Sequence, residues 1–213
     1  KRSIVAIAIS LLALAEIVDL TIVAVAIPQI MGAVGANVET IANITTVYIV
    51  MAAIFILLSG VIIDKYGIKR VALVSSVIFG ISSIMCGFST SLTEMIIFRA
   101  IQGIGGAFLP SVAQTYISTN FKGQEYSKMM TVYSMVIVMG PIIGPVLGGA
   151  ICENMSWPWI FYVNVPLCII GFLIISFMMQ TTKIKNIKVD YFSFIFMALG
   201  VGLLEIFIDN GNS

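Results

Sequence analysis

Long apolar runs without a single charge dominate this sequence. Four such runs cover residues 41–63, 71–93, 129–152 and 154–182. Each exceeds the roughly 20 residues that a helix needs to cross the hydrocarbon core of a bilayer. Three further apolar runs, at 4–27, 95–121 and 191–208, contain embedded charges. Because the runs are continuous and not alternating, strands of a membrane barrel are excluded. The sequence therefore predicts an all-α membrane protein with seven spanning helices.

The composition agrees with this fold class and excludes several functions. Hydrophobic residues make up 60% of the 213 residues and charged residues 10%, whereas soluble proteins carry about 25% charged residues. The net charge of +1 gives no electrostatic footprint for nucleic acid. The chain has no histidine, the commonest metal ligand and proton shuttle. We expect no metal and no cofactor, and we interpret Cys86, Cys152 and Cys168 as small hydrophobic residues.

The positive charges of the connections predict which way the helices point. Lysine and arginine precede the first span and occur in the second, fourth and sixth connections, whereas the odd-numbered connections contain none. Ten of the eleven cations thus fall on one side, and the eleventh, Arg99, lies inside a span. Because cationic loops stay cytoplasmic, we expect a multi-pass protein of the inner cell membrane with its N-terminus in the cytoplasm. The missing initiator Met and the polar tail suggest a piece of a longer protein.

A few ionisable residues lie at membrane depth, where a charge costs about 2.5–3.5 kcal/mol. Glu16 and Asp19 are three residues apart on one face of the first span. Asp19 precedes the expected end of this span by eight residues, and Arg99 lies about five residues into the fourth span from the same side. We therefore expect Asp19 or Glu16 to pair with Arg99 across a polar cavity in the outer half of the membrane. The alternative is an ion pair that only fixes helix packing. Glu205, near the outer end of the seventh span, is equally well interpreted as an interfacial acid or as a functional residue.

A carboxyl group beside a cavity can couple a proton to a ligand. Burial favours the neutral form of such a group, and a nearby cation favours the ionised form. Its proton affinity therefore depends on what else occupies the cavity, which is the minimum required to exchange protons against a ligand. In a chain without histidine, the carboxylates must carry this role.

The fifth span contains glycines at four-residue intervals interrupted by prolines: Gly140, Pro141, Gly144, Pro145, Gly148 and Gly149. Glycines at this spacing form a smooth groove that a neighbouring helix can approach closely. The prolines each delete a backbone hydrogen bond and bend the helix. We consider two interpretations, a plain packing interface with incidental kinks, or a hinge or sealed seam between helices that must separate.

Two further segments carry unusual spacings. In the fourth span, Arg99, Gln102 and Gly103 share one face, and Gly103 allows close approach beside the arginine. The second connection contains Gly60, Asp64, Lys65, Gly67, Lys69 and Arg70. In this connection Gly67 permits a tight reversal. Asp64 is positioned to accept hydrogen bonds from the N-terminus of another helix, as a latch on the cytoplasmic side. The alternative is a topogenic turn in which any basic residues would serve.

Together these three segments resemble the drug:proton antiporters of the major facilitator superfamily. Residues 60–70 resemble the loop-2/3 signature, except that Ile68 replaces a basic residue. Residues 99–103 are similar to the helix-4 motif, and residues 140–149 to the antiporter helix-5 motif. Residues 18–28, 157–166 and 205–211 resemble segments of the fourteen-span, EmrB/QacA-like branch, with Glu205 in place of glutamine. Glu16 is an extra acid that the helix-1 pattern does not require.

The resemblance implies an N-terminal six-helix bundle of two inverted three-helix repeats at residues 1–182. A cytoplasmic linker, a seventh linker helix and the start of an outer loop would follow at 183–213. A second, C-terminal bundle would close the translocation path. The resemblance further implies proton-driven efflux of lipophilic small molecules, including cations, and it allows a periplasmic adaptor protein as partner. Asp19 would take up and release the proton, and Glu16 would assist. Arg99 would tune the proton affinity of the Asp19 carboxylate, and the helix-5 glycines would hold the seam between the two bundles.

Three rival functions are compatible with parts of this pattern. A membrane-embedded enzyme needs a nucleophile–base pair or metal site, and the lack of histidine removes the usual arrangements. A solute symporter of the same superfamily is disfavoured only by the resemblance of residues 140–149. A non-transporting membrane scaffold would use the acids for packing alone. We expect Asp19→Asn to abolish efflux driven by a pH gradient while leaving folding largely intact.

Overall fold

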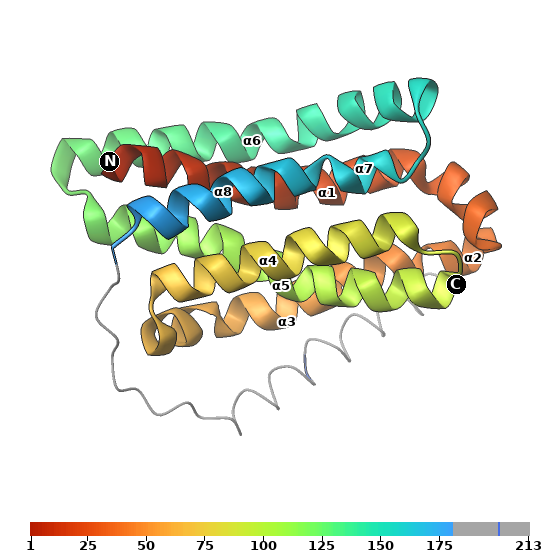
Figure 1. The fold of residues 1–213 in the computed structure, drawn as a ribbon, viewed down its shortest axis with the longest axis horizontal. Coiled ribbons are helices and arrows are strands. Elements are labelled where there is room, and N and C mark those ends of the chain that lie inside the picture. Colours follow the sequence, from red (N-terminus) through yellow and green to blue (C-terminus); the bar gives the residue numbers. More distant parts are fainter. Residues whose placement is uncertain (181–199, 201–213) are drawn as a thin grey trace.

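The computed structural model describes residues 1–180 and residue 200, and within these residues the chain is almost entirely helical, with no strand. The helices are α1 (Arg2–Val34), α2 (Val38–Ile41), α3 (Asn43–Tyr66), α4 (Ile68–Phe88), α5 (Leu92–Asn120), α6 (Gly123–Asn154), α7 (Trp159–Tyr162) and α8 (Asn164–Met178) (Figure 1). Among the described residues, six stretches are long and apolar enough to cross a membrane, with α2–α3 and α7–α8 each forming one stretch. The all-α prediction is confirmed. The seventh predicted span, including Glu205, lies outside the described residues apart from residue 200.

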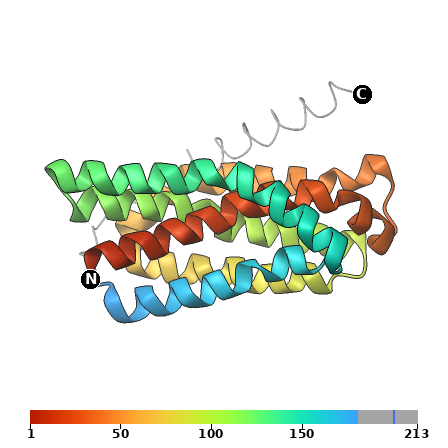
Figure 2. The same cartoon turned by 90° about the horizontal axis from the view of Figure 1, so that it is seen from above.

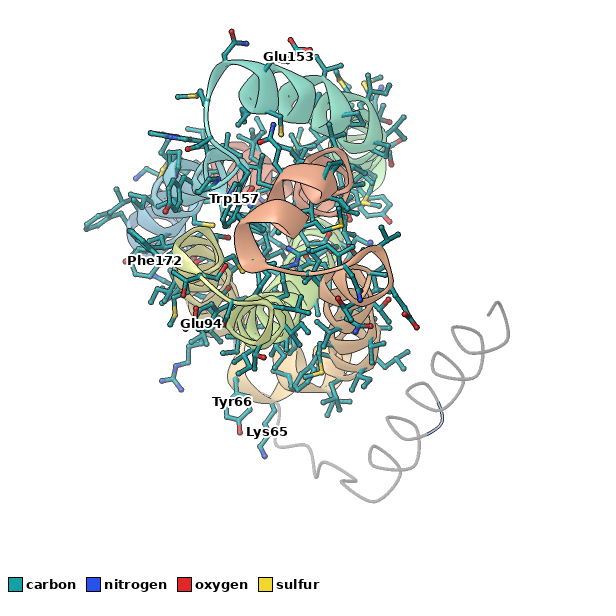
Figure 3. All side chains as sticks on the ribbon, turned by 90° about the vertical axis from the view of Figure 1, so that its right-hand side faces the viewer. Lys65, Tyr66, Glu94, Glu153, Trp157 and Phe172 are labelled. Carbon is teal, nitrogen blue, oxygen red and sulfur yellow. The ribbon has the colours of Figure 1, made fainter. Side chains whose placement is uncertain are left out.

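The six stretches pack in two layers (Figures 2 and 3). The four-helix layer contains α3, α5, α1 and α6 in that order, each packed against the next. The two-helix layer, nearer the viewer in Figure 1, contains α4, which packs on α5, and α8, which packs on α1 and on α4. Few residues of α3 and α6 are buried, so the outer helices of the four-helix layer present largely apolar, uncovered surfaces.

The packing pattern has a pseudo-two-fold relation between the first and second halves of the bundle. Helix α1 packs on α6 and α8 in the same way as α5 packs on α3 and α4. Exchanging α1 with α5, α3 with α6, and α4 with α8 therefore reproduces the set of contacts. Three consecutive spans are related to the next three, and an odd number of spans per repeat reverses its direction. This arrangement is that of inverted three-helix repeats.

The first span extends further than the sequence led us to expect. We placed its end at Ile27, before Pro28, but α1 continues through Pro28 to Val34. A proline inside a helix removes one backbone hydrogen bond, and burial of Ile30 and Val34 beyond it offsets that loss. The helix ends at Gly35, whose φ of 66° places it in the left-handed region and whose N–H binds the Met31 carbonyl.

The cationic connections gather at one end of the bundle. The start of α1, the α3–α4 turn, the α5–α6 turn and the end of α8 lie together at the left of Figure 1. Arg2 Nη1 donates to the Asn120 carbonyl at 3.2 Å, which joins the start of α1 to the end of α5. This clustering agrees with the two-sided distribution of charge that the sequence predicts.

Candidate functional site: a buried polar network inside the bundle

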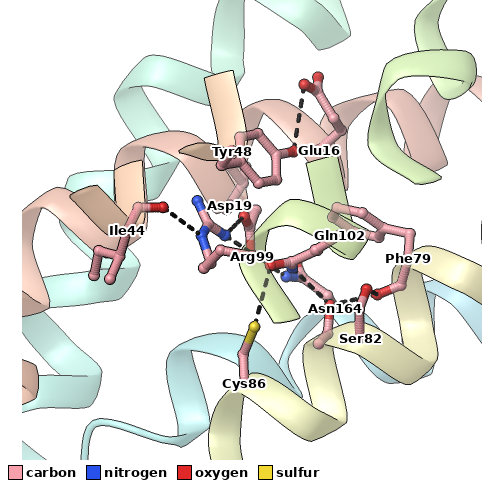
Figure 4. A network of polar contacts seen from close by, with 12 residues as sticks. Glu16, Asp19, Ile44, Tyr48, Phe79, Ser82, Cys86, Arg99, Gln102 and Asn164 are labelled. Carbon is pink, nitrogen blue, oxygen red and sulfur yellow. Dashed lines mark hydrogen bonds and ion pairs between the residues drawn. The ribbon is translucent and has the colours of Figure 1, made fainter. Parts of the chain in front are cut away.

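Asp19 is the centre of a polar network inside the bundle (Figure 4). Arg99 Nη1 donates to Asp19 Oδ2 and forms an ion pair with it. Asp19 Oδ1 accepts two further hydrogen bonds, from Gln102 Nε2 at 2.9 Å and from Asn164 Nδ2 at 2.8 Å. Three side chains from α5 and α8 thus converge on one carboxylate of α1.

Gln102 connects this carboxylate to α4 of the two-helix layer. Its Oε1 accepts from Arg99 Nη1 at 2.7 Å and from the Cys86 thiol at 3.6 Å. Its Nε2 also donates to Ser83 Oγ at 2.8 Å. Ser83 and Cys86 belong to α4, so these side chains join α1, α4, α5 and α8. With the contacts that Arg99 makes to Ile44 and Tyr48 of α3, the network reaches five of the six membrane-length stretches.

The network is fully buried, and this corrects one expectation. The side chains of Asp19, Arg99, Gln102 and Asn164 have no exposed surface, so the ion pair forms directly inside the bundle and not across a polar cavity. Asp19 lies next to the midpoint of the 33-residue helix α1, whereas Arg99 lies in the first third of α5, so the predicted depth of the pair in the outer half of the membrane stays a prediction.

Arg99 is held by more than its acid partner. Its Nε donates to the Ile44 carbonyl at 3.3 Å, and its guanidinium carbon lies 4.0 Å from the centre of the Tyr48 ring. A guanidinium stacked on an aromatic face gains a cation–π attraction that grows when water is excluded. Two buried atoms of the network have no hydrogen-bond partner among the described residues, Arg99 Nη2 and Asn164 Oδ1. The network therefore retains hydrogen-bonding capacity for a different arrangement.

Glu16 does not pair with Arg99. It contacts Tyr48 of α3, whose hydroxyl donates to Glu16 Oε1 at 3.5 Å. The Tyr48 ring lies between the Glu16 carboxylate and the guanidinium (Figure 4). Of the two acids that the sequence offered as partners for Arg99, the structure selects Asp19.

Glycines of α5 make room for Tyr48. A Cβ at Gly103 would lie 2.6 Å from the Tyr48 carbonyl oxygen, and one at Gly106 would lie 2.8 Å from its hydroxyl and 3.0 Å from Glu16 Cγ. The close approach expected at Gly103 is therefore present, and it is made by α3. Gly106 has the same effect one turn further along.

The glycine face of α6 packs on α1. A Cβ at Gly140 would lie 2.5 Å from Ile17 Cγ2, one at Gly144 would overlap Thr21, and one at Gly148 would lie 3.1 Å from the Ile22 carbonyl. Thr21 Oγ1 also lies 3.5 Å from the Gly140 carbonyl. These glycines form a seam with α1 inside the described bundle, and the predicted seam with a second bundle stays a prediction. Gly149 faces open space, and Pro141 and Pro145 remain inside the continuous helix α6.

The 60–70 segment forms the turn between α3 and α4. Asp64 and Lys65 lie in the last turn of α3, and Gly67 makes the reversal with φ 84° and ψ 145°. Lys69 Nζ donates to the Ser176 carbonyl at 2.8 Å, near the C-terminal end of α8, where a cation complements the helix dipole. A Cβ at Gly60 would have no neighbouring atom within 4 Å, so packing inside this bundle does not require a glycine there.

Sequence reasoning missed four residues of the network: Asn164, Tyr48, Ser83 and Cys86, the last of which we interpreted as a small hydrophobic residue although its thiol donates to Gln102. Asn164 is an amide inside the apolar run of residues 154–182, and a buried amide in such a run needs a partner, so this signal was available. Tyr48 gave no comparable signal, because an aromatic residue in an apolar helix usually packs in the core.

No group of three Cys, Asp or Glu side chains suited to a metal ion occurs in the part of the chain that is described.

Residues 9–204 match the family model of the Major Facilitator Superfamily. This match covers most of the chain, including all residues of the network. The chain belongs to the major facilitator superfamily. Its inverted-repeat packing and six membrane-length helices agree with this assignment.

Curated relatives within this superfamily bear names of drug exporters. The chain is 35% identical to the multidrug export protein EmrB of Escherichia coli K12 over 98% of its own length. It is 35% identical to the probable multidrug resistance protein EmrY of the same organism over 97% of its length. It is 31% identical to the putative multidrug resistance protein MdtD of Yersinia pestis over 91%. The chain spans only 41%, 41% and 42% of these three relatives, respectively.

Proposed function

We propose that this chain forms the N-terminal half of a proton-coupled multidrug exporter that works by alternating access. In this proposal Asp19 takes up and releases the proton. Arg99 balances the negative charge of the Asp19 carboxylate, and Gln102 and Asn164 hold that carboxylate in position. The substrates are lipophilic small molecules, and the proton gradient, with no cofactor, supplies the energy. The protein would lie in the inner cell membrane with its N-terminus in the cytoplasm.

The observation that carries this proposal is the fully buried Asp19–Arg99 ion pair. Removing two charges from water is expensive, and apolar residues of similar volume often stabilise a protein as well or better. An intramembrane ion pair is therefore a functional candidate by default. A proton on Asp19 would remove the charge that pairs with Arg99 and weaken the bonds from α5 and α8, so protonation and helix arrangement are physically linked.

The uncovered surface of the four-helix layer supports the need for a second bundle. The buried residues of α6 are Tyr133 and the glycines 140, 144 and 148, whereas Met135, Val138 and Ile142 are more than half exposed. Such a surface suits either lipid or a second helical bundle. In the proposal, residues 1–182 form one bundle, residues 183–213 form the linker with a seventh helix, and the Asp64 turn latches the cytoplasmic gate. The adaptor protein implied by the resemblance belongs to this proposal as well.

The experiment compares drug efflux by the complete transporter and its variants in vesicles with an imposed pH gradient. Asp19→Asn should abolish gradient-driven efflux. This change leaves Arg99 buried without a counter-charge, which costs about 3–5 kcal/mol, so the expectation of largely intact folding needs a control. The double variant Asp19→Asn, Arg99→Gln keeps the site neutral and should fold well while still failing to transport. Normal efflux by a folded Asp19 variant would refute the proposal and favour a scaffold role for the acids. Drug uptake along with protons would instead favour a symporter.

A further inference from the structure

A cavity of about 410 Å³ opens at the end of the bundle where the cationic connections gather. It is lined by residues 1–3, at the start of α1, and by residues of the 121–129 segment, at the start of α6 (Figure 1). The proposed transport mechanism makes no use of this cavity. The charges of its lining residues are therefore the guide to a ligand.

The lining contains three cations and one acid, namely Lys1, Arg2, Lys128 and Glu125. Within the described residues, Glu125 forms no ion pair with any of these cations. It lies in the first turn of α6, where an acid complements the helix dipole. Arg2 donates to the Asn120 carbonyl, whereas the side-chain amines of Lys1 and Lys128 have no partner in residues 1–180. The cavity thus carries an excess of positive charge.

Other cations at the same end of the bundle have partners in the protein. Lys69 donates to the Ser176 carbonyl, and Lys65 lies 5.3 Å from the centre of the Tyr66 ring. Cations that serve only to orient spans need not share one cavity, and bringing like charges together costs Coulomb energy. A bound anion would turn this repulsion into attraction.

A phosphate group suits this lining better than a plain anion. Arginine offers a planar fork of N–H donors and lysine a compact charge, and both side chains bind phosphate oxygens. Buried Phe121 and half-buried Met129 belong to or pack against the apolar core cluster, so an apolar wall lies beside the cations. In the proposed orientation, this end faces the leaflet that holds anionic lipids.

We propose that this cavity binds a phosphate group with a net negative charge, held by Lys1, Arg2 and Lys128. The source is the headgroup of an anionic phospholipid or free phosphate. Because the ligand contacts both α1 and α6, binding would tie the starts of these two helices together. The site goes beyond the proposed transport function and does not depend on it.

The test measures binding of phosphatidylglycerol to the purified complete transporter in a neutral detergent by native mass spectrometry. Phosphatidylcholine is the matched ligand, because it has the same phosphodiester but adds a positive charge, and it should bind the wild type more weakly. Lys128→Gln should weaken binding of phosphatidylglycerol about fivefold, the usual contribution of one lysine near an anionic surface, and Lys1→Gln, Lys128→Gln about 25-fold. Neither change removes a hydrogen bond or ion pair of the described chain, so both variants should fold.

Two further variants separate the cavity from general surface charge. Lys122→Gln removes an exposed cation six residues from Lys128 that does not line the cavity, and it should leave the affinity unchanged. Glu125→Gln removes the acid from the lining and should tighten binding of phosphatidylglycerol.

Inorganic phosphate distinguishes the two sources. It is added to the complex with phosphatidylglycerol, with chloride at equal ionic strength as the control for screening. Displacement of the lipid by phosphate and not by chloride would assign the cavity to the phosphate group alone, free or lipid-bound. Lysine-dependent lipid binding that phosphate does not displace would assign it to the lipid headgroup.

Two outcomes would overturn the proposal. Equal losses in Lys128→Gln and Lys122→Gln would show that any surface cation at this end contributes alike. Equal affinity of the wild type for the two lipids would show that the positive lining selects no anion. The binding test uses no pH gradient, so a protein that binds phosphatidylglycerol through Lys128 but shows no efflux would remove the exporter and retain the site.

Discussion

The contact between α1 and α6 makes a quantitative prediction, because α6 offers a test glycine and a control glycine five residues apart. In Gly144→Ala, the new methyl group would lie 2.8 Å from Thr21 Cβ and 3.2 Å from the Ile22 backbone nitrogen, and it would overlap Thr21 Oγ1. Rotating the Thr21 side chain moves its oxygen but leaves Cβ and the backbone in place. The helices must therefore move apart. Gly149→Ala meets no atom within 4 Å.

The magnitude follows from the difference between the two variants. Both exchange glycine for alanine in the interior of the same helix, so both gain a similar helix propensity of about 0.5–1 kcal/mol. This gain cancels in the comparison and leaves the overpacking penalty, which is about 1–3 kcal/mol. Gly144→Ala should be less stable than Gly149→Ala by that amount. Adding Thr21→Ala should recover part of the loss, because the oxygen clash disappears while the clash with Cβ remains.

The assay is equilibrium unfolding of the purified complete transporter by sodium dodecyl sulfate in mixed micelles, followed by circular dichroism. A Gly144→Ala protein as stable as Gly149→Ala would refute the close approach of α1 and α6. A loss of the same size in both variants would show that glycine is required along α6 for a reason other than packing on α1.

Three further predictions concern stability and use thermal unfolding of the same protein. Gly67→Ala should lower the free energy of unfolding by about 1–3 kcal/mol, because the φ of 84° and ψ of 145° at this position strain any residue with a Cβ. Gly60→Ala in the same motif should lose no stability, and equal losses in the two variants would contradict this interpretation of the turn. Lys69→Met should lower the free energy of unfolding by about 1 kcal/mol, because it removes the hydrogen bond from Lys69 to the end of α8. Lys122→Met at an exposed position is the control, and equal losses in the two variants would count against that hydrogen bond. Asn164→Ala should lower the free energy of unfolding by about 1–3 kcal/mol, because it removes a hydrogen-bond donor from buried Asp19. An equal loss in Asn154→Ala, at an exposed position, would contradict the hydrogen bond between Asn164 and Asp19.

Much of the fold was readable from the sequence because membrane spans are set by length and charge alone. The same holds for the glycine face of α6, since the four-residue spacing dictates one side of a helix whatever its partner. The partner itself was not readable. The spacing of Gly140, Gly144 and Gly148 says that a helix approaches, and only the structure shows that this helix is α1.

The candidate site was predicted in part for similar reasons. Arg99 and an acid of α1 had to meet because buried charges need partners, but two acids one turn apart could not be ranked from spacing. The ranking depends on Tyr48, which lies over the guanidinium and separates it from Glu16. The end of the first span was wrong because proline usually ends a helix, whereas packing beyond Pro28 extends α1 to Val34.

The central claim is that the carboxylate held by Arg99, Gln102 and Asn164 is the group whose proton is exchanged for drug. The most direct measurement follows the pH of a weakly buffered solution of the purified complete transporter while a saturating drug is added. The wild type should release protons on drug binding, and the folded double variant Asp19→Asn, Arg99→Gln should bind the drug and release none. Proton release of wild-type size from that variant would place the exchanging group elsewhere and contradict the account.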